Sequence, residues 1–291
     1  MQSNSSYTRF WRKSLPYLRL IRLDAPIGYW LLLWPCWLGV AMSDASLESV
    51  PSLLLLFLLG ALSMRSAGCI FNDIIDRDFD RHVTRTQNRP LVSGEVPITS
   101  AILLMSVLCL VGLAILIQFN DTAILVGLGA LPLILGYPFM KRITWWPQVW
   151  LGLTFNWGAL VSSAAVGGQI YTWSIALYIA GIFWTLGYDT IYAHQDKDSD
   201  ALIGVKSSAL RLGSTTKPAI AAFYSLSLLS LYVSAVLAAL AWPAFLGLTV
   251  GGLHFIWQIR SVNLDDPKSC LKMFQSNHSF AAVIFVGFIA G

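Results

Sequence analysis

Nine long apolar segments dominate this chain and restrict its fold class. They cover residues 26–43, 51–74, 98–118, 121–138, 147–167, 172–193, 218–239, 242–259 and 274–291. A transmembrane helix needs about 20 predominantly apolar residues, and in lipid a helix satisfies its own backbone hydrogen bonds. Only 12% of the residues are charged, whereas soluble domains have about 25%. The sequence therefore predicts an all-α, polytopic protein with nine transmembrane helices in a lipid bilayer.

The distribution of positive charge predicts the orientation of these helices. All Lys and Arg residues except Arg65 lie in the first 25 residues or in alternate loops, and the intervening loops hold none. Cytoplasmic loops of membrane proteins carry this excess of positive charge. We therefore expect the N-terminus and the basic loops on the cytoplasmic or matrix face. Because the positive charges lie in short loops between apolar segments, nucleic-acid binding is not expected.

The charge pattern also divides the chain into two expected parts. Residues 1–25 contain five basic residues and several serines before the first apolar segment: Arg9, Arg12, Lys13, Arg19 and Arg22. This composition predicts a basic interfacial arm. Residues 26–291 are expected to form a single transmembrane domain.

A dense acidic cluster follows the second apolar segment. Asp73, Asp76 and Asp80 are spaced i, i+3 and i+7, which places them on one face of a helix, with Asn72 at its edge and Asp78 on the opposite side. Charge at the end of a membrane helix is costly and is typical of functional sites.

A second acidic cluster follows the sixth apolar segment. Asp189, Asp196 and Asp200 are spaced i, i+7 and i+11, which again predicts one shared helix face. Carboxylate oxygens bind hard divalent cations, and Mg²⁺ typically combines one or two carboxylates with water and substrate phosphates. The two clusters together predict a membrane enzyme that binds a diphosphate through Mg²⁺.

Basic residues accompany both clusters and favour the same interpretation. They are Arg77, Arg81, Arg85 and Arg89 after the first cluster, Lys197, Lys206 and Arg211 after the second, and Lys141 and Arg142 at the end of the fourth segment. Lys and Arg side chains bind phosphate oxygens, although loop cations also anchor membrane proteins at anionic headgroups. Arg65 lies within an apolar segment and is expected either to pair with the first cluster or to contact substrate.

The motifs around the two clusters resemble those of a known family. NDIIDRDFD (72–80) is similar to the NDxxDxxxD motif of the UbiA intramembrane prenyltransferases, and DKDSD (196–200) is similar to their DxxxD motif. The flanking blocks resemble the 4-hydroxybenzoate polyprenyltransferases of ubiquinone synthesis: DAPIGYWLLLWP, MRSAGCIFND, VTRTQNRPLVSG, YPFMKRITWWPQ, LGLTFNWGAL and GVKSSALRLG. The resemblance extends from about Arg19 to the C-terminus.

The resemblance implies a fold, a reaction and a set of residue roles. Nine helices would surround a central cavity, a polyprenyl diphosphate would be the donor and 4-hydroxybenzoate the acceptor, prenylated at its 3-position. Asp73, Asp76 and Asp80 would hold one Mg²⁺, and Asp196 and Asp200 another. The remaining assignments are a diphosphate or substrate contact for Arg65 and Lys141, a carboxylate- or water-orienting role for Asn72, an acceptor-carboxylate contact for Arg142, and phenol activation or proton removal for Asp189.

Two alternatives to this function stay open from the sequence. One is a prenyltransferase of the same family with another aromatic acceptor. The other is an ion-coupled transporter that uses membrane carboxylates. The expected location is the bacterial inner (cytoplasmic) membrane with the site on the cytoplasmic face, or alternatively the mitochondrial inner membrane with the site on the matrix face.

Overall fold

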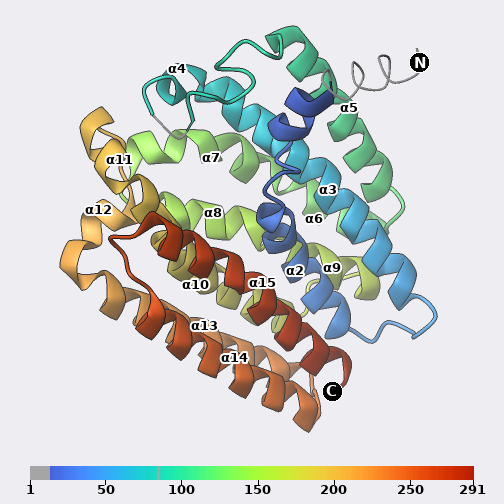
Figure 1. Ribbon diagram of the computed structural model, residues 1–291. Coiled ribbons are helices and arrows are strands. Elements are labelled where there is room, and N and C mark those ends of the chain that lie inside the picture. The colour runs from blue at the N-terminus through green and yellow to red at the C-terminus, as the bar shows by residue number, and fades with distance from the viewer. Residues whose placement is uncertain (1–13, 84–85) are drawn as a thin grey trace, which may run out of the picture. The chain divides into compact units, whose positions relative to one another are not determined.

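The computed structural model describes residues 14–83 and 86–291, and these residues contain helices and no strands. Residues 14–20 are helical, and the helices that follow are shown in Figure 1. Their bounds are α2 Ile27–Ala41, α3 Val50–Ile75, α4 Arg77–Asp80, α5 Ile98–Leu116, α6 Asp121–Leu128, α7 Leu131–Ile143, α8 Pro147–Phe155, α9 Gly158–Gly167, α10 Thr172–Ala193, η1 His194–Asp196, α11 Lys197–Ile203, α12 Ser208–Leu212, η2 Gly213–Thr215, α13 Thr216–Leu237, α14 Trp242–Ser261 and α15 Pro267–Ile289.

The helices confirm the all-α, membrane-spanning fold class. Within the described stretches, six helical segments are long and apolar enough to cross a membrane, and α2 is apolar but shorter. The helix α14 nearly coincides with the eighth apolar segment of the sequence, whereas α15 begins at Pro267, seven residues before the predicted start of the ninth. The protein is therefore a multi-pass membrane protein, whereas nine crossings remain a prediction.

Two of the predicted segments are interrupted helices. Pro132, the second residue of α7, lacks an N–H, and its ring would clash with the carbonyl of Leu128 in a continuous helix; α6 ends at Leu128 for this reason. Between α8 and α9, the Asn156 side chain donates hydrogen bonds to Gly152 O (2.8 Å) and Thr185 Oγ1 (2.9 Å). The interruption thus places a polar side chain against α10.

The structure consists of two compact units. The first comprises the chain up to Tyr29 together with Leu59–Ile115, and the second comprises Trp30–Leu58 and Leu116–Gly291. This division does not test the prediction that residues 26–291 form a single transmembrane domain.

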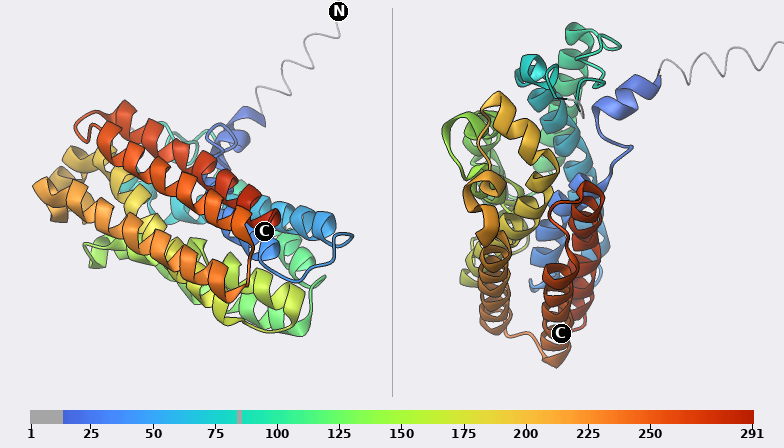
Figure 2. Two further views of the ribbon diagram at one scale, coloured as in Figure 1. Left: turned by 90° about the horizontal axis from the view of Figure 1, so that it is seen from below. Right: turned by 60° about the vertical axis from the view of Figure 1, so that its left-hand side comes forward.

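The second unit is a bundle centred on α10, which packs against α8, α13 and α15. α13, α14 and α15 run side by side (Figure 1 and Figure 2). Glycines allow the helices to approach closely: a Cβ on Gly247 would lie 3.2 Å from Gly287 Cα, and one on Gly39 would lie 1.9 Å from Ser162 Oγ. Small residues at such contacts are characteristic of helix packing in membranes.

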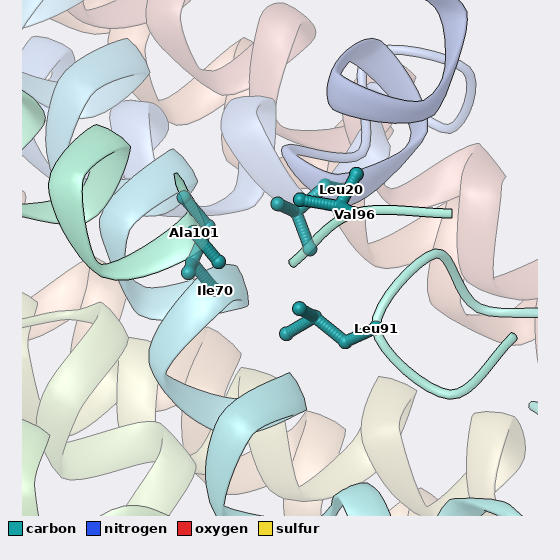
Figure 3. Close-up of a cluster of buried hydrophobic side chains, with 5 residues drawn as sticks. All are labelled: Leu20, Ile70, Leu91, Val96 and Ala101. Atoms are coloured by element: carbon teal, nitrogen blue, oxygen red, sulfur yellow. The ribbon is translucent and has the colours of Figure 1, made fainter. Parts of the chain in front are cut away.

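The first unit has a small apolar core where the N-terminal segment packs against α3 and α5 (Figure 3). Its buried members are Leu20, Ile70, Leu91, Val96 and Ala101. Leu20 is completely buried, so the helix at residues 14–20 is part of this unit. Burial of a Leu side chain contributes about 1.5–3 kcal/mol. The same core fixes the loop that carries Leu91 and Val96 next to the end of α3.

Candidate functional site

The three carboxylates of the first acidic cluster are buried at the end of α3. Asp73, Asp76 and Asp80 are 1%, 6% and 5% exposed, whereas the Asp78 side chain is 88% exposed. Helical hydrogen bonding continues across the junction of α3 and α4, because Asp76 N donates to Asn72 O and Asp80 N to Asp76 O, both at 2.9 Å. This continuity explains the difference in burial between the three carboxylates and Asp78.

Two arginines of the first unit pair with Asp73 and Asp80 of this cluster. Arg22 Nη2 lies 2.7 Å from Asp73 Oδ1 and 2.9 Å from Asp73 Oδ2. Arg89 Nη1 connects two carboxylates, at 3.1 Å from Asp73 Oδ1 and 2.5 Å from Asp80 Oδ2. A buried carboxylate is stable only when it is paired and hydrogen-bonded, and these two guanidinium groups satisfy that condition.

A tight turn brings Arg22 to the cluster. Arg22 has a φ of 64°, a left-handed conformation that is costly for a residue with a Cβ. The turn is held by hydrogen bonds from Leu23 N to Leu18 O and from Arg22 Nη1 to Arg19 O, both at 3.0 Å, and Arg19 pairs with Glu95. Of the predicted interfacial arm, Arg9, Arg12 and Lys13 lie outside the described residues.

The other bases after the first cluster have separate partners. Arg77 Nε donates to Leu91 O at 3.0 Å. Arg81 lies 3.7 Å from Asp78 in an exposed pair, and Arg85 lies outside the described residues. Only a minor stabilisation is expected from the exposed pair.

Arg65 occupies a restricted position about two helical turns before Asp73. A Cβ on Gly28 would lie 2.7 Å from Arg65 Nε and 2.8 Å from Arg65 Nη2. Next to Arg65, Ser66 Oγ is hydrogen-bonded to the Tyr29 hydroxyl at 2.9 Å. Gly28 therefore leaves the space that the guanidinium fills, and Tyr29 fixes the same part of α2 to α3.

The second acidic cluster lies on an interrupted helix. α10 ends at Ala193, η1 follows, and α11 begins at Lys197, so the expected continuous helix from Asp189 to Asp200 is wrong. A 3₁₀ turn advances about 120° per residue instead of 100°, so three such residues rotate the later carboxylates by roughly 60° relative to Asp189. Asp189, Asp196 and Asp200 are all partly exposed.

The end of α7 is attached to the segment that follows the second cluster. Lys206 N donates to Lys141 O at 2.9 Å, and Lys206 Nζ donates to Ile143 O at 3.0 Å. One residue earlier, Val205 N donates to Asp200 O at 3.0 Å. The backbone of Lys141 is thereby held close to that of Asp200. Lys141 is partly buried and Arg142 is exposed.

In the described part of this structure the first cluster is paired with arginine and not grouped around a metal position. Among residues 14–83 and 86–291, no three His, Cys, Asp or Glu side chains are grouped to hold a metal ion. Arg89 Nη1 contacts both Asp73 and Asp80. Carboxylates buried together at one helix end fit Mg²⁺, which uses one or two of them and completes its shell with water or phosphate.

A family model matches most of the chain. The UbiA prenyltransferase family matches residues 32–284. The chain belongs to this family. The match includes the buried cluster at the end of α3 and the interrupted second cluster.

Curated relatives in animals share much of the sequence. The chain is 46% identical over 280 residues to "4-hydroxybenzoate polyprenyltransferase, mitochondrial" of Aedes aegypti, covering 95% of this chain and 63% of the relative. It is 42% identical over 279 residues to the Homo sapiens protein of the same name, covering 95% of this chain and 75% of the relative. The chain thus spans less than two-thirds of the mosquito protein.

Solved structures of UbiA homologues have the same fold. The apo homologue from Aeropyrum pernix K1 has a TM-score of 0.76 at 24% identity, covering 92% of this chain and 98% of the other. The homologue from Archaeoglobus fulgidus bound to GPP and Mg²⁺ has a TM-score of 0.68 at 21% identity, covering 95% and 100%. These similarities support the helical architecture of the chain.

Sequence reasoning missed the pairing of Arg22 with Asp73. The two residues are separated by 51 positions, and the interpretation of residues 1–25 as an interfacial arm gave Arg22 no internal partner. The block DAPIGYW, which directly follows the turn, was the available signal. It contains Gly28 and Tyr29, both of which contact α3 next to the cluster.

Proposed function

We propose that this protein transfers a polyprenyl group from polyprenyl diphosphate to the 3-position of 4-hydroxybenzoate, in a Mg²⁺-dependent reaction of ubiquinone biosynthesis. The observation that carries the proposal is the 42–46% identity, over 95% of this chain, to relatives named for this acceptor and donor class. The carboxylates buried at the end of an apolar helix support the proposal, because they would hold the Mg²⁺ that assists diphosphate release.

The acidic clusters would bind the metal ions of the reaction. Asp73, Asp76 and Asp80 would hold one Mg²⁺, and Asp196 and Asp200 another. Bound Mg²⁺ would neutralise the charge that develops on the departing diphosphate. Lys141 and Arg65 would donate to the remaining diphosphate oxygens, and Asn72 would orient a carboxylate or a water molecule of the first cluster.

The acceptor would be bound and activated by residues of the second unit. Arg142 would pair with the carboxylate of 4-hydroxybenzoate through charge-assisted hydrogen bonds. Asp189 would accept the phenol proton or the proton lost from the ring carbon after the new C–C bond forms. Both assignments use groups with access to solvent, since Arg142 is exposed and Asp189 is partly exposed.

The lipid bilayer would supply the donor to this site. A polyprenyl tail partitions into the hydrocarbon, so a membrane enzyme takes its donor directly from lipid. We propose that the site faces the cytoplasm in a bacterial inner membrane or, alternatively, the matrix in a mitochondrial inner membrane. The names of the curated relatives agree with the mitochondrial alternative.

The test is an assay of the purified protein in nanodiscs with 4-hydroxybenzoate and a polyprenyl diphosphate. We expect 3-polyprenyl-4-hydroxybenzoate and diphosphate to form with Mg²⁺ and to be absent with a chelator. Asp73→Asn is expected to abolish both products, and Asp78→Asn is the matched control because its side chain is exposed in the same segment.

The outcomes separate the possible functions. Diphosphate release without the 3-prenyl product would reject this acceptor and keep prenyl transfer to another ring. Substrate movement across the membrane without diphosphate release would favour the transporter. Full activity in the presence of chelator would reject the Mg²⁺ assignment.

A further inference from the structure

Arg22 occupies the part of Asp73 that a metal ion would need. Its Nη2 atom lies within hydrogen-bond distance of both carboxylate oxygens, at 2.7 and 2.9 Å. Mg²⁺ contacts oxygen ligands at about 2.0–2.1 Å, and a second cation in that position would be repelled by the guanidinium. Arg22 and Mg²⁺ therefore compete for Asp73 Oδ2, whereas Asp73 Oδ1 also contacts Arg89.

We propose that Arg22 is a positioning residue that gates cation binding at Asp73. In the metal-free protein the guanidinium keeps the buried carboxylate paired, and cation binding requires Arg22 to leave. The inference rests on the proposed Mg²⁺ role of Asp73 and adds a residue that controls access to it.

The backbone of the turn favours a releasable contact. Arg22 has a left-handed φ of 64°, and such strained residues persist only while their surroundings hold them in place. Its side chain is fixed by Asp73 and by its own bond to Arg19 O. When the contact to Asp73 is lost, one of the interactions that hold this conformation is lost with it and the bond from Leu23 N to Leu18 O remains, so residues 21–25 would loosen without unfolding.

Arg89 has a different position and would remain in place. Its Nη1 atom contacts one oxygen of Asp73 and one oxygen of Asp80, so it holds the two carboxylates near each other. Arg22 additionally contacts Asp73 Oδ2. Departure of Arg22 would therefore expose Asp73 Oδ2 while the spacing of the two carboxylates is kept.

The experiment measures Mn²⁺ binding by electron paramagnetic resonance, with purified protein in nanodiscs and no diphosphate. Arg22→Gln is expected to bind Mn²⁺ about fivefold more tightly or better than the wild type, because the competing cation is removed. Arg22→Lys, which keeps the charge, should restore an affinity near that of the wild type. Arg19→Gln is the matched control, since Arg19 lies in the same segment but pairs with Glu95.

Hydrogen–deuterium exchange of the wild-type protein gives a second measurement, which does not depend on how a variant folds. Amides of residues 21–25 are expected to exchange faster when Mn²⁺ is added. Unchanged exchange at saturating Mn²⁺, or an Arg22→Gln affinity equal to or weaker than the wild type, would overturn the gating role.

Asp73→Asn distinguishes failure of the gate from failure of the proposed function. If the wild type binds Mn²⁺, Asp73→Asn does not, and Arg22→Gln behaves as the wild type, the metal site stands and the gate is rejected. If Asp73→Asn binds Mn²⁺ as tightly as the wild type, or if neither the wild type nor Arg22→Gln binds it even after inorganic diphosphate is added, the metal role of Asp73 is rejected and the gate with it.

Discussion

The two acidic clusters have similar sequence patterns but different surroundings. The carboxylates at the end of α3 are almost completely buried, and two of them, Asp73 and Asp80, contact arginine. Those after α10 are partly exposed and lie on a helix interrupted by η1. The same spacing of carboxylates therefore gives one cluster that is neutralised within its own unit and another that is accessible to water.

This difference predicts different contributions to folding and catalysis. A buried carboxylate needs a partner in every state of the protein, so the first cluster depends on its arginines even without metal. A partly exposed carboxylate retains contact with water and has a smaller cost when unpaired. We therefore expect the first cluster to affect both stability and activity, and the second cluster mainly activity.

The largest expected effect compares Asp73→Asn with Asp196→Asn. Both should reduce kcat by about 100-fold or more, because each removes a negative ligand from the charge-stabilising site. Only Asp73→Asn should also lower the free energy of unfolding, since it removes a charged partner from two arginines. Product formation and thermal unfolding in detergent measure the two effects. Equal loss of stability in both variants would contradict the comparison.

The next largest effect is expected for Arg89→Ala. This change leaves Asp80 without the guanidinium that lies 2.5 Å away, and breaking a buried pair by removing one partner costs roughly 3–5 kcal/mol. The loss of unfolding free energy should lie near the lower end of this range, because the Arg89 side chain is 21% exposed. Chemical unfolding of the metal-free protein measures it, with Arg81→Ala as the exposed control. A loss below that of Arg81→Ala would show that the first cluster does not need its arginines.

The helices were largely predictable because apolar length and charge placement determine where a chain crosses lipid. The predicted segment 172–193 coincides with α10, and 98–118 nearly coincides with α5. The breaks were missed because hydropathy ignores local backbone geometry. Pro132 ends α6, and the Asn156 side chain bonds to Thr185 where α8 ends. The 3₁₀ turn at η1 likewise has no apolar signature.

The candidate site was predictable in its carboxylates but not in their partners. Helical spacing separates buried Asp73 and Asp80 from exposed Asp78, a local property of one helix end. The contact of Arg22 depends on a left-handed residue and on the packing of Leu20 against α3, which are features of the tertiary structure. Local spacing in the sequence therefore identifies the acidic residues, whereas their arginine partners are identified only from the tertiary structure.

A smaller effect is expected where Arg65 packs against Gly28. Gly28→Ala places a methyl group 2.7 Å from Arg65 Nε, and overpacking of this kind typically costs about 1–3 kcal/mol. Because Arg65 must move, the KM for the polyprenyl diphosphate should rise. Gly68→Ala is the matched control, since a Cβ there meets nothing within 4 Å. Steady-state kinetics checks the prediction, and an unchanged KM in Gly28→Ala would remove Arg65 from the donor site.

The smallest expected effect on stability is that of Arg142→Ala in the second unit, which tests acceptor binding. Arg142 is exposed, so Arg142→Ala should not lower the free energy of unfolding by more than about 0.5 kcal/mol. Its hydrogen bonds to the acceptor carboxylate should contribute about 1.5–3 kcal/mol, which corresponds to a KM for 4-hydroxybenzoate that is higher by roughly 10-fold or more. The KM for the donor should stay the same, and Arg211→Ala tests whether loss of any basic side chain near the second cluster has this effect. An unchanged KM for 4-hydroxybenzoate in Arg142→Ala would assign acceptor binding to other residues, whereas a selective rise would show that the accessible part of the site recognises the acceptor without contributing to the fold.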